Sequence, residues 1–113
     1  METIEERVAR LEYYNRLTVQ SINLRSYPFY SLVMEKHLTE EEVEGVLSLC
    51  DVLQQHYEVY VDRGYTQFLP LLLHFAGMLS PKLKPKATIQ ALLAQDLYRD
   101  LMLTLDELAQ RYE

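Results

Sequence analysis

Three histidines are the first candidates for catalysis or metal binding in this chain, and they lie far apart, at His37, His56 and His74. A zinc or di-iron site on helices uses closely spaced ligands, such as the Glu-x-x-His step. The residues three positions before these histidines are all apolar. We therefore interpret His74, which lies in an apolar segment, as a hydrogen-bonded core or interface histidine rather than a catalytic one.

The single cysteine, Cys50, is the other candidate for covalent chemistry. It shares an apolar stripe with Val46, Leu47 and Leu53, and no base close to it in the sequence marks it as a nucleophile. A buried cysteine behaves as a small hydrophobic residue, so we predict a structural role. One cysteine also excludes an internal disulfide framework and is typical of a reducing cytosol.

A row of carboxylates could in principle hold a cation. Glu44, Asp51 and Glu58 recur at heptad spacing, with Asp62 one turn further on. Calcium and magnesium prefer oxygen ligands, but those ligands must converge on the ion, and side chains on one straight helix diverge. We interpret this row as a solvated face.

The only basic cluster is formed by Lys82, Lys84 and Lys86, in a loop bracketed by prolines that leads into a helix. A helix N-terminus with lysines nearby can bind an anion or an acidic partner. The alternative is a solvated loop whose charges favour solubility. Both interpretations stay open at this point.

Other signatures of catalysis or nucleic-acid binding are missing. The chain has no glycine-rich phosphate loop and no Gly-x-Ser-x-Gly elbow, so we predict no catalytic, cofactor-binding or metal-binding residues and no cofactor. The net charge is −6, and residues 38–62 include seven acidic side chains and no Lys or Arg. Such a segment repels phosphates, so we expect no nucleic-acid partner, and a DNA-binding helix-turn-helix ranks last among the functions considered.

Size and hydropathy indicate one soluble domain. A chain of 113 residues suffices for a single helical domain over 1–113 with a core that buries roughly 65% of the unfolded surface. The segment "METIEERVARLEYY" lacks the apolar centre of a signal peptide. The longest apolar run, 68–79, is shorter than the roughly 20 residues of a membrane span. We expect a cytoplasmic protein with no membrane partner.

Apolar residues recur with a period near 3.6 along the whole chain, which predicts an all-α bundle of five to six helices. The first helix is expected over Thr3–Asn23, and the second over Pro28–Lys36, with proline at its first position. In "LTEEEV", Thr39 and Glu42 have the spacing of a capping box that starts the third helix, and Gly64 is placed to end it.

Prolines and an aspartate mark the later helices. The fourth is expected to begin at Thr66 or Leu69, depending on the use of Pro70, and its apolar residues on nearly every side predict a central helix buried all round. Pro85 begins the fifth, and Asp96 is expected to cap the last. The predicted inner face of the last helix consists of Leu97, Leu101, Leu105, Leu108 and Tyr112.

The first helix has more apolar surface than a monomer needs. Six positions follow the alternating four- and three-residue steps of a coiled-coil seam, namely Ile4, Val8, Leu11, Asn15, Thr18 and Ile22. Asn15 falls at an a position, where a polar residue sets register and oligomer state. A second apolar stripe includes Tyr13 and Leu17, so one face can pack on the chain's own core while the other meets another chain. We predict a homo-oligomer, dimer or trimer; the alternative is an amphipathic helix inside one domain.

The stretch "RSYPFYSLVMEKH", residues 25–37, places three aromatic side chains around Pro28. It is either a docking surface or a joint that packs one helix on another. We favour the joint, and therefore expect Phe29 and at least one of Tyr27 and Tyr30 to be mostly buried.

Several short stretches, in order along nearly the whole chain, carry a family resemblance: "RLEYY" at 10–14, "YPFY" at 27–30, "CD" at 50–51, "FAGML" at 75–79 and "LYRDLM" at 97–102. With them the chain resembles the YhaI-like proteins, small uncharacterised proteins of Gram-positive spore-forming bacteria. The resemblance implies an all-helical, self-associating domain and no known reaction. That family tends to be apolar where this chain has Asn15.

Two functions follow from these observations. The first is a non-enzymatic, cytosolic, homo-oligomeric protein that acts through protein–protein contacts as an adaptor or regulator, with itself or another protein as partner. The second is a small-molecule binding protein or enzyme with a pocket near Tyr27, Tyr30, His74 and Tyr98, because tyrosine and histidine supply polar groups inside apolar pockets.

Overall fold

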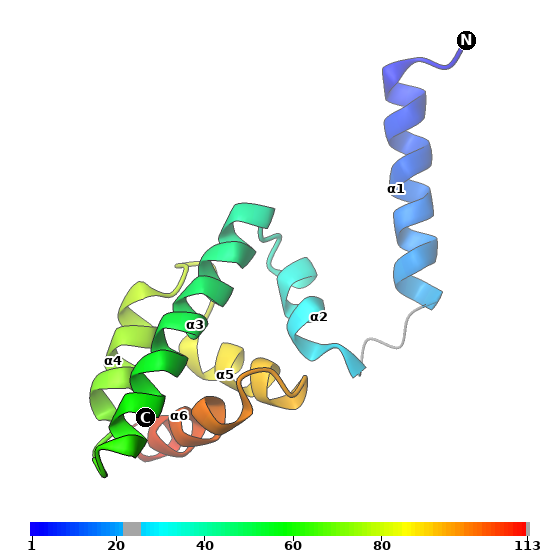
Figure 1. Ribbon diagram of the computed structural model, residues 1–113. Helices are drawn as coiled ribbons and strands as arrows, with labels where there is room; N and C mark the ends of the chain where they lie inside the picture. The colour runs from blue at the N-terminus through cyan, green and yellow to red at the C-terminus, as the bar shows by residue number, and fades with distance from the viewer. Residues whose placement is uncertain (22–25, 113) are drawn as a thin grey trace.

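A computed structural model describes residues 1–21 and 26–112 of the chain (Figure 1). Within this part the chain is all-helical, which confirms the predicted fold class of a multi-helix bundle with a long N-terminal helix. The helices are α1 (Ile4–Ser21), α2 (Pro28–Glu35), α3 (Glu40–Asp62), α4 (Leu69–Met78), α5 (Pro85–Ala94) and α6 (Arg99–Arg111). The predicted last residues of the first helix, 22–23, lie outside the described residues.

The predicted helix starts are confirmed at three sites. The Thr39 backbone N–H donates to Glu42 Oε1 at 3.0 Å, and the Glu42 N–H donates to Thr39 Oγ1 at 3.2 Å. This reciprocal pair is the capping box expected for α3. Pro85 occupies the first turn of α5, and Pro70 that of α4, where a missing N–H leaves no helical hydrogen bond unmade.

Three helices end in the same Schellman-type motif, each with a left-handed residue just past the helix. These residues are His37 (φ 55°), Gly64 (φ 74°) and Asp96 (φ 64°). In each case two backbone N–H groups return to carbonyls of the last turn, as Gly64 does to Val61 and Tyr65 does to Tyr60. The expected role of Gly64 is confirmed. Asp96 does not cap the last helix as expected: it terminates α5, and its carboxylate accepts from Arg99 at 2.9 Å.

The core is built by α2 to α6. In the structure α5 packs against α2 and α6, and α4 packs against α3 and α6. The fully buried hydrophobic side chains are Phe29, Cys50, Leu53, Phe75, Ile89, Leu92, Leu101, Met102 and Leu105. Thr88 is also fully buried, and its hydroxyl donates to the Lys84 carbonyl at 2.8 Å, which satisfies the polar group locally.

The predicted burial of the fourth helix on every side and of the C-terminal tyrosine is wrong. The fourth helix, α4, is not buried all round, because Leu73 and Met78 are 63% and 68% exposed while Leu71, Leu72 and Phe75 face the core. Tyr112 was expected on the inner face of the last helix and is more than half exposed, whereas Leu101, Leu105 and Leu108 are buried there as predicted. All three of these side chains, Leu73, Met78 and Tyr112, are mostly exposed to solvent.

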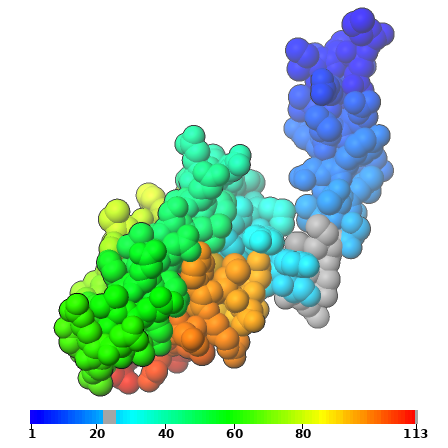
Figure 2. Space-filling view, in the orientation of Figure 1, coloured from blue at the N-terminus to red at the C-terminus, as the bar shows by residue number. Residues whose placement is uncertain are grey.

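The first helix stands apart from this body (Figures 1 and 2). The molecule measures 65 × 25 × 24 Å and has a Cα radius of gyration of 17.5 Å. A compact chain of this length has a radius of gyration of about 13 Å. The excess comes from α1, which is about 27 Å long at 1.5 Å per residue and contains no buried residue.

The aromatic segment at the start of α2 is a joint with one buried ring. Phe29 is 0% exposed, whereas Tyr27 and Tyr30 are 45% and 51% exposed and stack on each other with ring centroids 6.0 Å apart. The expectation of a buried Phe29 is confirmed, and that of a buried tyrosine is wrong. Gln95, at the end of α5, accepts from the backbone N–H of Phe29 at 2.9 Å and of Tyr30 at 3.3 Å. A side chain distant in sequence thus caps α2.

Replacing Phe29 with alanine should lower the free energy of unfolding by about 3 kcal/mol or more, because the change leaves a cavity in a closed core. Tyr30→Ala is the matched control and should cost about 1 kcal/mol or less, since its ring is half exposed. Urea unfolding followed by circular dichroism measures both. Equal losses in the two variants would contradict the assignment of Phe29 as the anchor.

Candidate functional site

The apolar seam predicted on the first helix is solvent-exposed throughout its described length. We call Ile4, Val8, Leu11, Asn15 and Thr18 the α1 seam; all five are exposed, Ile4 to 78%. Ile22, the sixth predicted interface residue, lies outside the described residues. An exposed apolar stripe on one face of a helix makes it a candidate interaction surface, and the interface itself stays a prediction.

Several polar groups of α1 have partners within the same helix or just before it. Thr3 Oγ1 accepts from the Glu6 backbone N–H at 3.1 Å and caps the helix start. The Thr18 hydroxyl donates to the Tyr14 carbonyl at 2.9 Å, so it needs no further partner. Arg10 pairs with Glu2 at 2.9 Å on an exposed flank. Among the described residues of the seam, Asn15 has a polar side chain that is exposed and makes no hydrogen bond within the described part of the chain.

The second apolar stripe of α1 does not pack on the body either. Tyr13 and Leu17 are each about half exposed, and the Arg16 guanidinium lies 5.9 Å from the Tyr13 ring centre. The expectation that one face of this helix covers the chain's own core is wrong for the described residues. The physical reason is that α2 to α6 close their core without it.

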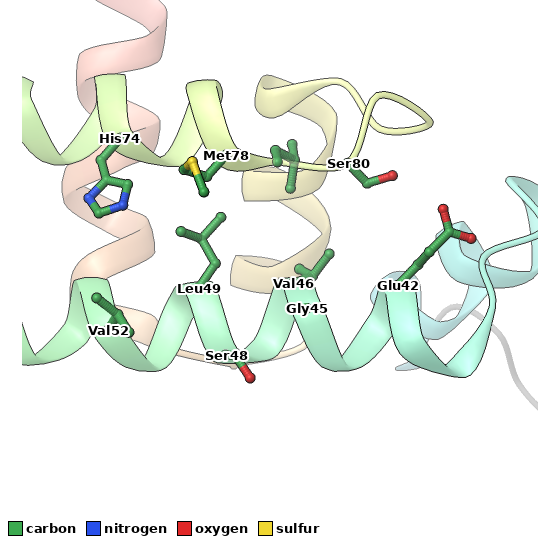
Figure 3. Close-up of a pocket in the computed structure, with 10 residues that line it drawn as sticks. Glu42, Gly45, Val46, Ser48, Leu49, Val52, His74, Met78 and Ser80 are labelled. Carbon is green, nitrogen blue, oxygen red and sulfur yellow. The ribbon is translucent and has the colours of Figure 1, made fainter.

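A groove lies between α3 and α4, on the body (Figure 3). Its volume is about 490 Å³, and its walls are mainly apolar. Leu49 of α3 and Met78 of α4 point toward each other across it, and His74 lies at one end (Figure 3). The lining residues are Glu42, Gly45, Val46, Ser48, Leu49, Val52, His74, Met78, Leu79 and Ser80.

This groove is not the pocket suggested by the sequence. Of the four residues named for that pocket, His74 lines the groove, and the three tyrosines do not. Tyr27 and Tyr30 stack on the surface of α2. Tyr98 donates its hydroxyl to Asp51 Oδ1 at 2.6 Å, which joins the start of α6 to α3. Burial and this hydrogen bond to a carboxylate raise the pKa of Tyr98 well above its ordinary value.

Two histidines that are far apart in sequence come together next to the groove, and one of them, His74, lines it. The rings of His56 on α3 and His74 on α4 lie with centroids 6.1 Å apart, and both are exposed. Sequence reasoning missed this pair because its members are on different helices. The one signal that could have predicted the pair is that both residues lie on the sides of α3 and α4 that face each other. No group of three or more metal-ligating side chains occurs among residues 1–21 and 26–112.

Cys50 is fully buried, as its apolar stripe predicted. Burial, aided by the neighbouring charge of Asp51, raises the pKa of the thiol to about 12. Because the thiolate is the reactive form, this cysteine is inert near neutral pH. Its role is to fill the core.

The basic loop forms a strap across the body. Lys82 Nζ pairs with Glu42 Oε1 at 2.7 Å and also donates to the His37 carbonyl at 3.2 Å. It therefore ties the loop before α5 to the turn between α2 and α3, a role that neither interpretation of the sequence included. The hydrogen bond from Lys82, with help from the Thr39 N–H, lowers the pKa of Glu42 below its ordinary value of 4.5.

These features define a small helical protein with an inert, closed core and a projecting amphipathic helix. The chain belongs to the family described as "Protein of unknown function (DUF1878)", whose model matches residues 1–110. The sequence resemblance predicted membership of a small uncharacterised family along nearly the whole chain, and this match confirms it. None of the helices described in the structure is long and apolar enough to cross a membrane.

The Lys82–Glu42 pair predicts a pH-dependent contribution to stability. Because the folded state lowers the pKa of Glu42, this contribution is present above 4.5 and is lost as the pH falls through the lowered pKa. Lys82→Met should therefore lower the free energy of unfolding near neutral pH, and the difference from wild type should shrink on acidification. Urea unfolding at about pH 7 and about pH 3 measures it.

Lys84→Met is the matched control for this experiment, since Lys84 is an exposed neighbour in the same loop. It should leave stability nearly unchanged at both pH values. If the loss of unfolding free energy in Lys82→Met grows as the pH falls, the stabilising role of the Lys82–Glu42 pair is contradicted.

Proposed function

We propose that this protein is a non-enzymatic, cytosolic homo-oligomer that acts through protein–protein contacts, with α1 as the contact surface. The observation that carries the proposal is the exposure of the whole apolar face of an 18-residue helix. Burying such a face is the dominant favourable term in most protein association. We further propose that the chain is YhaI-like and of Gram-positive origin, as the sequence resemblance implies.

The energetics of an isolated helix support this proposal. Helices shorter than about 15 residues are marginal in water, and most helical stability in proteins comes from packing an amphipathic face. The α1 helix is only slightly longer than that limit and has no buried residue. A partner that covers its seam supplies the packing that the rest of the chain does not.

The body supports a role without catalysis. Its one thiol is buried and inert. The tyrosine with the strongly raised pKa, Tyr98, is engaged in a structural hydrogen bond between α6 and α3. The side chains with perturbed pKa values therefore maintain the fold, and the exposed apolar helix is the feature left for function.

Sedimentation or light scattering of the wild-type chain at tens of micromolar should give an oligomer. Val8→Asp combined with Leu11→Asp should shift it to monomer, because association would bury each charged aspartate in an apolar seam and remove its water. Far-ultraviolet circular dichroism should still show a folded body, as α1 contributes nothing to the core.

Ala9→Asp combined with Gln20→Asp is the matched control. It adds the same charge to the opposite side of α1, and it should leave the mass unchanged. A monomeric wild-type protein would overturn the proposal, and an unchanged mass in the Val8 and Leu11 variant would place the interface elsewhere.

The groove between α3 and α4 favours a second candidate function, the binding of a small apolar molecule. Its volume of about 490 Å³ lies within the range of ligand pockets, roughly 300–1,000 Å³. His74 supplies a polar group at one end of the apolar walls (Figure 3). Gly45 opens one wall, since a Cβ added there would meet nothing within 4 Å.

For this second candidate, a thermal-shift screen with a metabolite panel should yield a ligand that stabilises the wild type. Gly45→Leu should abolish that shift by filling the groove. Gly77→Leu is the matched control, because Gly77 is also within a helix with open space around it and does not line the groove. Equal loss of the shift in both variants, or no ligand at all, would reject the groove as a ligand site.

A further inference from the structure

The five described residues of the α1 seam occupy a and d positions of a heptad repeat. Val8 and Asn15 fall at a, while Ile4, Leu11 and Thr18 fall at d. A β-branched residue at a with leucine at d favours two strands, and a single asparagine at a fixes register and oligomer state. The central part of the seam, from Val8 to Asn15, therefore fits a two-stranded coiled coil.

The residues that flank the seam distinguish the two possible orientations of such a pair. Glu5, Glu12 and Val19 lie at e positions, and Arg7, Tyr14 and Ser21 lie at g positions. In a parallel pair, a g residue of one helix meets the e residue of the next heptad on the other helix. Arg7 of each copy then meets Glu12 of the other, an attractive pair that occurs twice.

An antiparallel pair sets like charges against each other. There, e positions meet e positions, so Glu12 faces acidic residues of the second copy. In addition, a positions meet d positions, so Asn15 faces an apolar or already satisfied side chain such as Leu11 or Thr18. A buried amide left unpaired is costly.

We infer that α1 pairs with α1 of a second copy as a parallel, in-register, two-stranded coiled coil. Arg7 of each copy pairs with Glu12 of the other, and the two Asn15 amides hydrogen-bond across the seam. This inference rests on the proposed function, because it specifies the partner and geometry of the same surface.

The side chains that this geometry uses are available in the single chain. Within residues 1–21 and 26–112, those of Arg7, Glu12 and Asn15 have no hydrogen-bond or ion-pair partner. An asparagine amide has both donor and acceptor groups, so two copies of Asn15 satisfy each other. Arg10 and Arg16, in contrast, are engaged on the flanks of α1 by Glu2 and Tyr13.

A disulfide across the seam tests the orientation in the full-length chain. Ile4→Cys places one thiol at a d position near the start of α1, and in a parallel pair the two thiols face each other. Mild oxidation should convert most of the protein to a covalent dimer, with the buried Cys50 unreacted. If the Ile4→Cys variant has the same dimer mass as the wild type but forms no cross-link, the parallel geometry is overturned.

A single charge change tests the flanking pair. Glu12→Gln should weaken dimerisation roughly threefold to tenfold in a parallel pair, because it removes two exposed ion pairs. In an antiparallel pair the same change should strengthen dimerisation, because it removes the repulsion between acidic e positions. A lower or unchanged dissociation constant would therefore overturn the inference. Glu6→Gln, at an f position away from the seam, is the matched control and should have no effect.

Mixing two variants completes the test. Arg7→Glu and Glu12→Arg should each dimerise weakly alone, and their equimolar mixture should recover the wild-type dissociation constant through oppositely charged pairs. No recovery would count against the Arg7–Glu12 pairing. A monomeric wild type would overturn the proposed function itself. A different result would overturn only the parallel geometry: the wild type forms a dimer, the Val8→Asp and Leu11→Asp changes dissociate it, and Ile4→Cys forms no cross-link.

Discussion

The burial of Phe29 anchors α2, the helix that follows α1 in the chain, to the rest of the core. Phe29 is the only buried residue of α2, and α2 is the element through which the chain passes from α1 to the body. The Gln95 side chain completes the anchor by capping the first turn of α2 from the end of α5. This ring and this amide thereby hold the start of α2 against a core whose other buried residues come from α3 to α6 and the loop between α4 and α5.

Local signals in the sequence predicted the helices well. The capping box at Thr39, the prolines at 28 and 85 and the left-handed Gly64 act within one helical turn, so their effect does not depend on the rest of the fold. Asp96 was assigned to the wrong helix because an aspartate is favourable both as an N-cap and in the left-handed conformation, and only the tertiary path decides between them.

Contacts between distant segments explain what the sequence did not reveal about the candidate sites. The Lys82–Glu42 strap, the Gln95 cap and the His56–His74 pair each join residues from different helices or loops. Hydropathy could not show that α4 has an exposed side, because an apolar helix has the same pattern whether one face or every face is covered. The α1 seam was visible in the sequence because a heptad repeat is a property of one helix.

Because α1 contributes no buried residue to the core, the proposed dimer would have two separate sources of stability. The body unfolds by a unimolecular reaction whose free energy does not depend on protein concentration. A helix stabilised by a second copy obeys mass action instead, so its order rises with concentration. In the proposed dimer, a single melting temperature would therefore not describe the molecule, and the protein concentration would control how well its first helix is ordered.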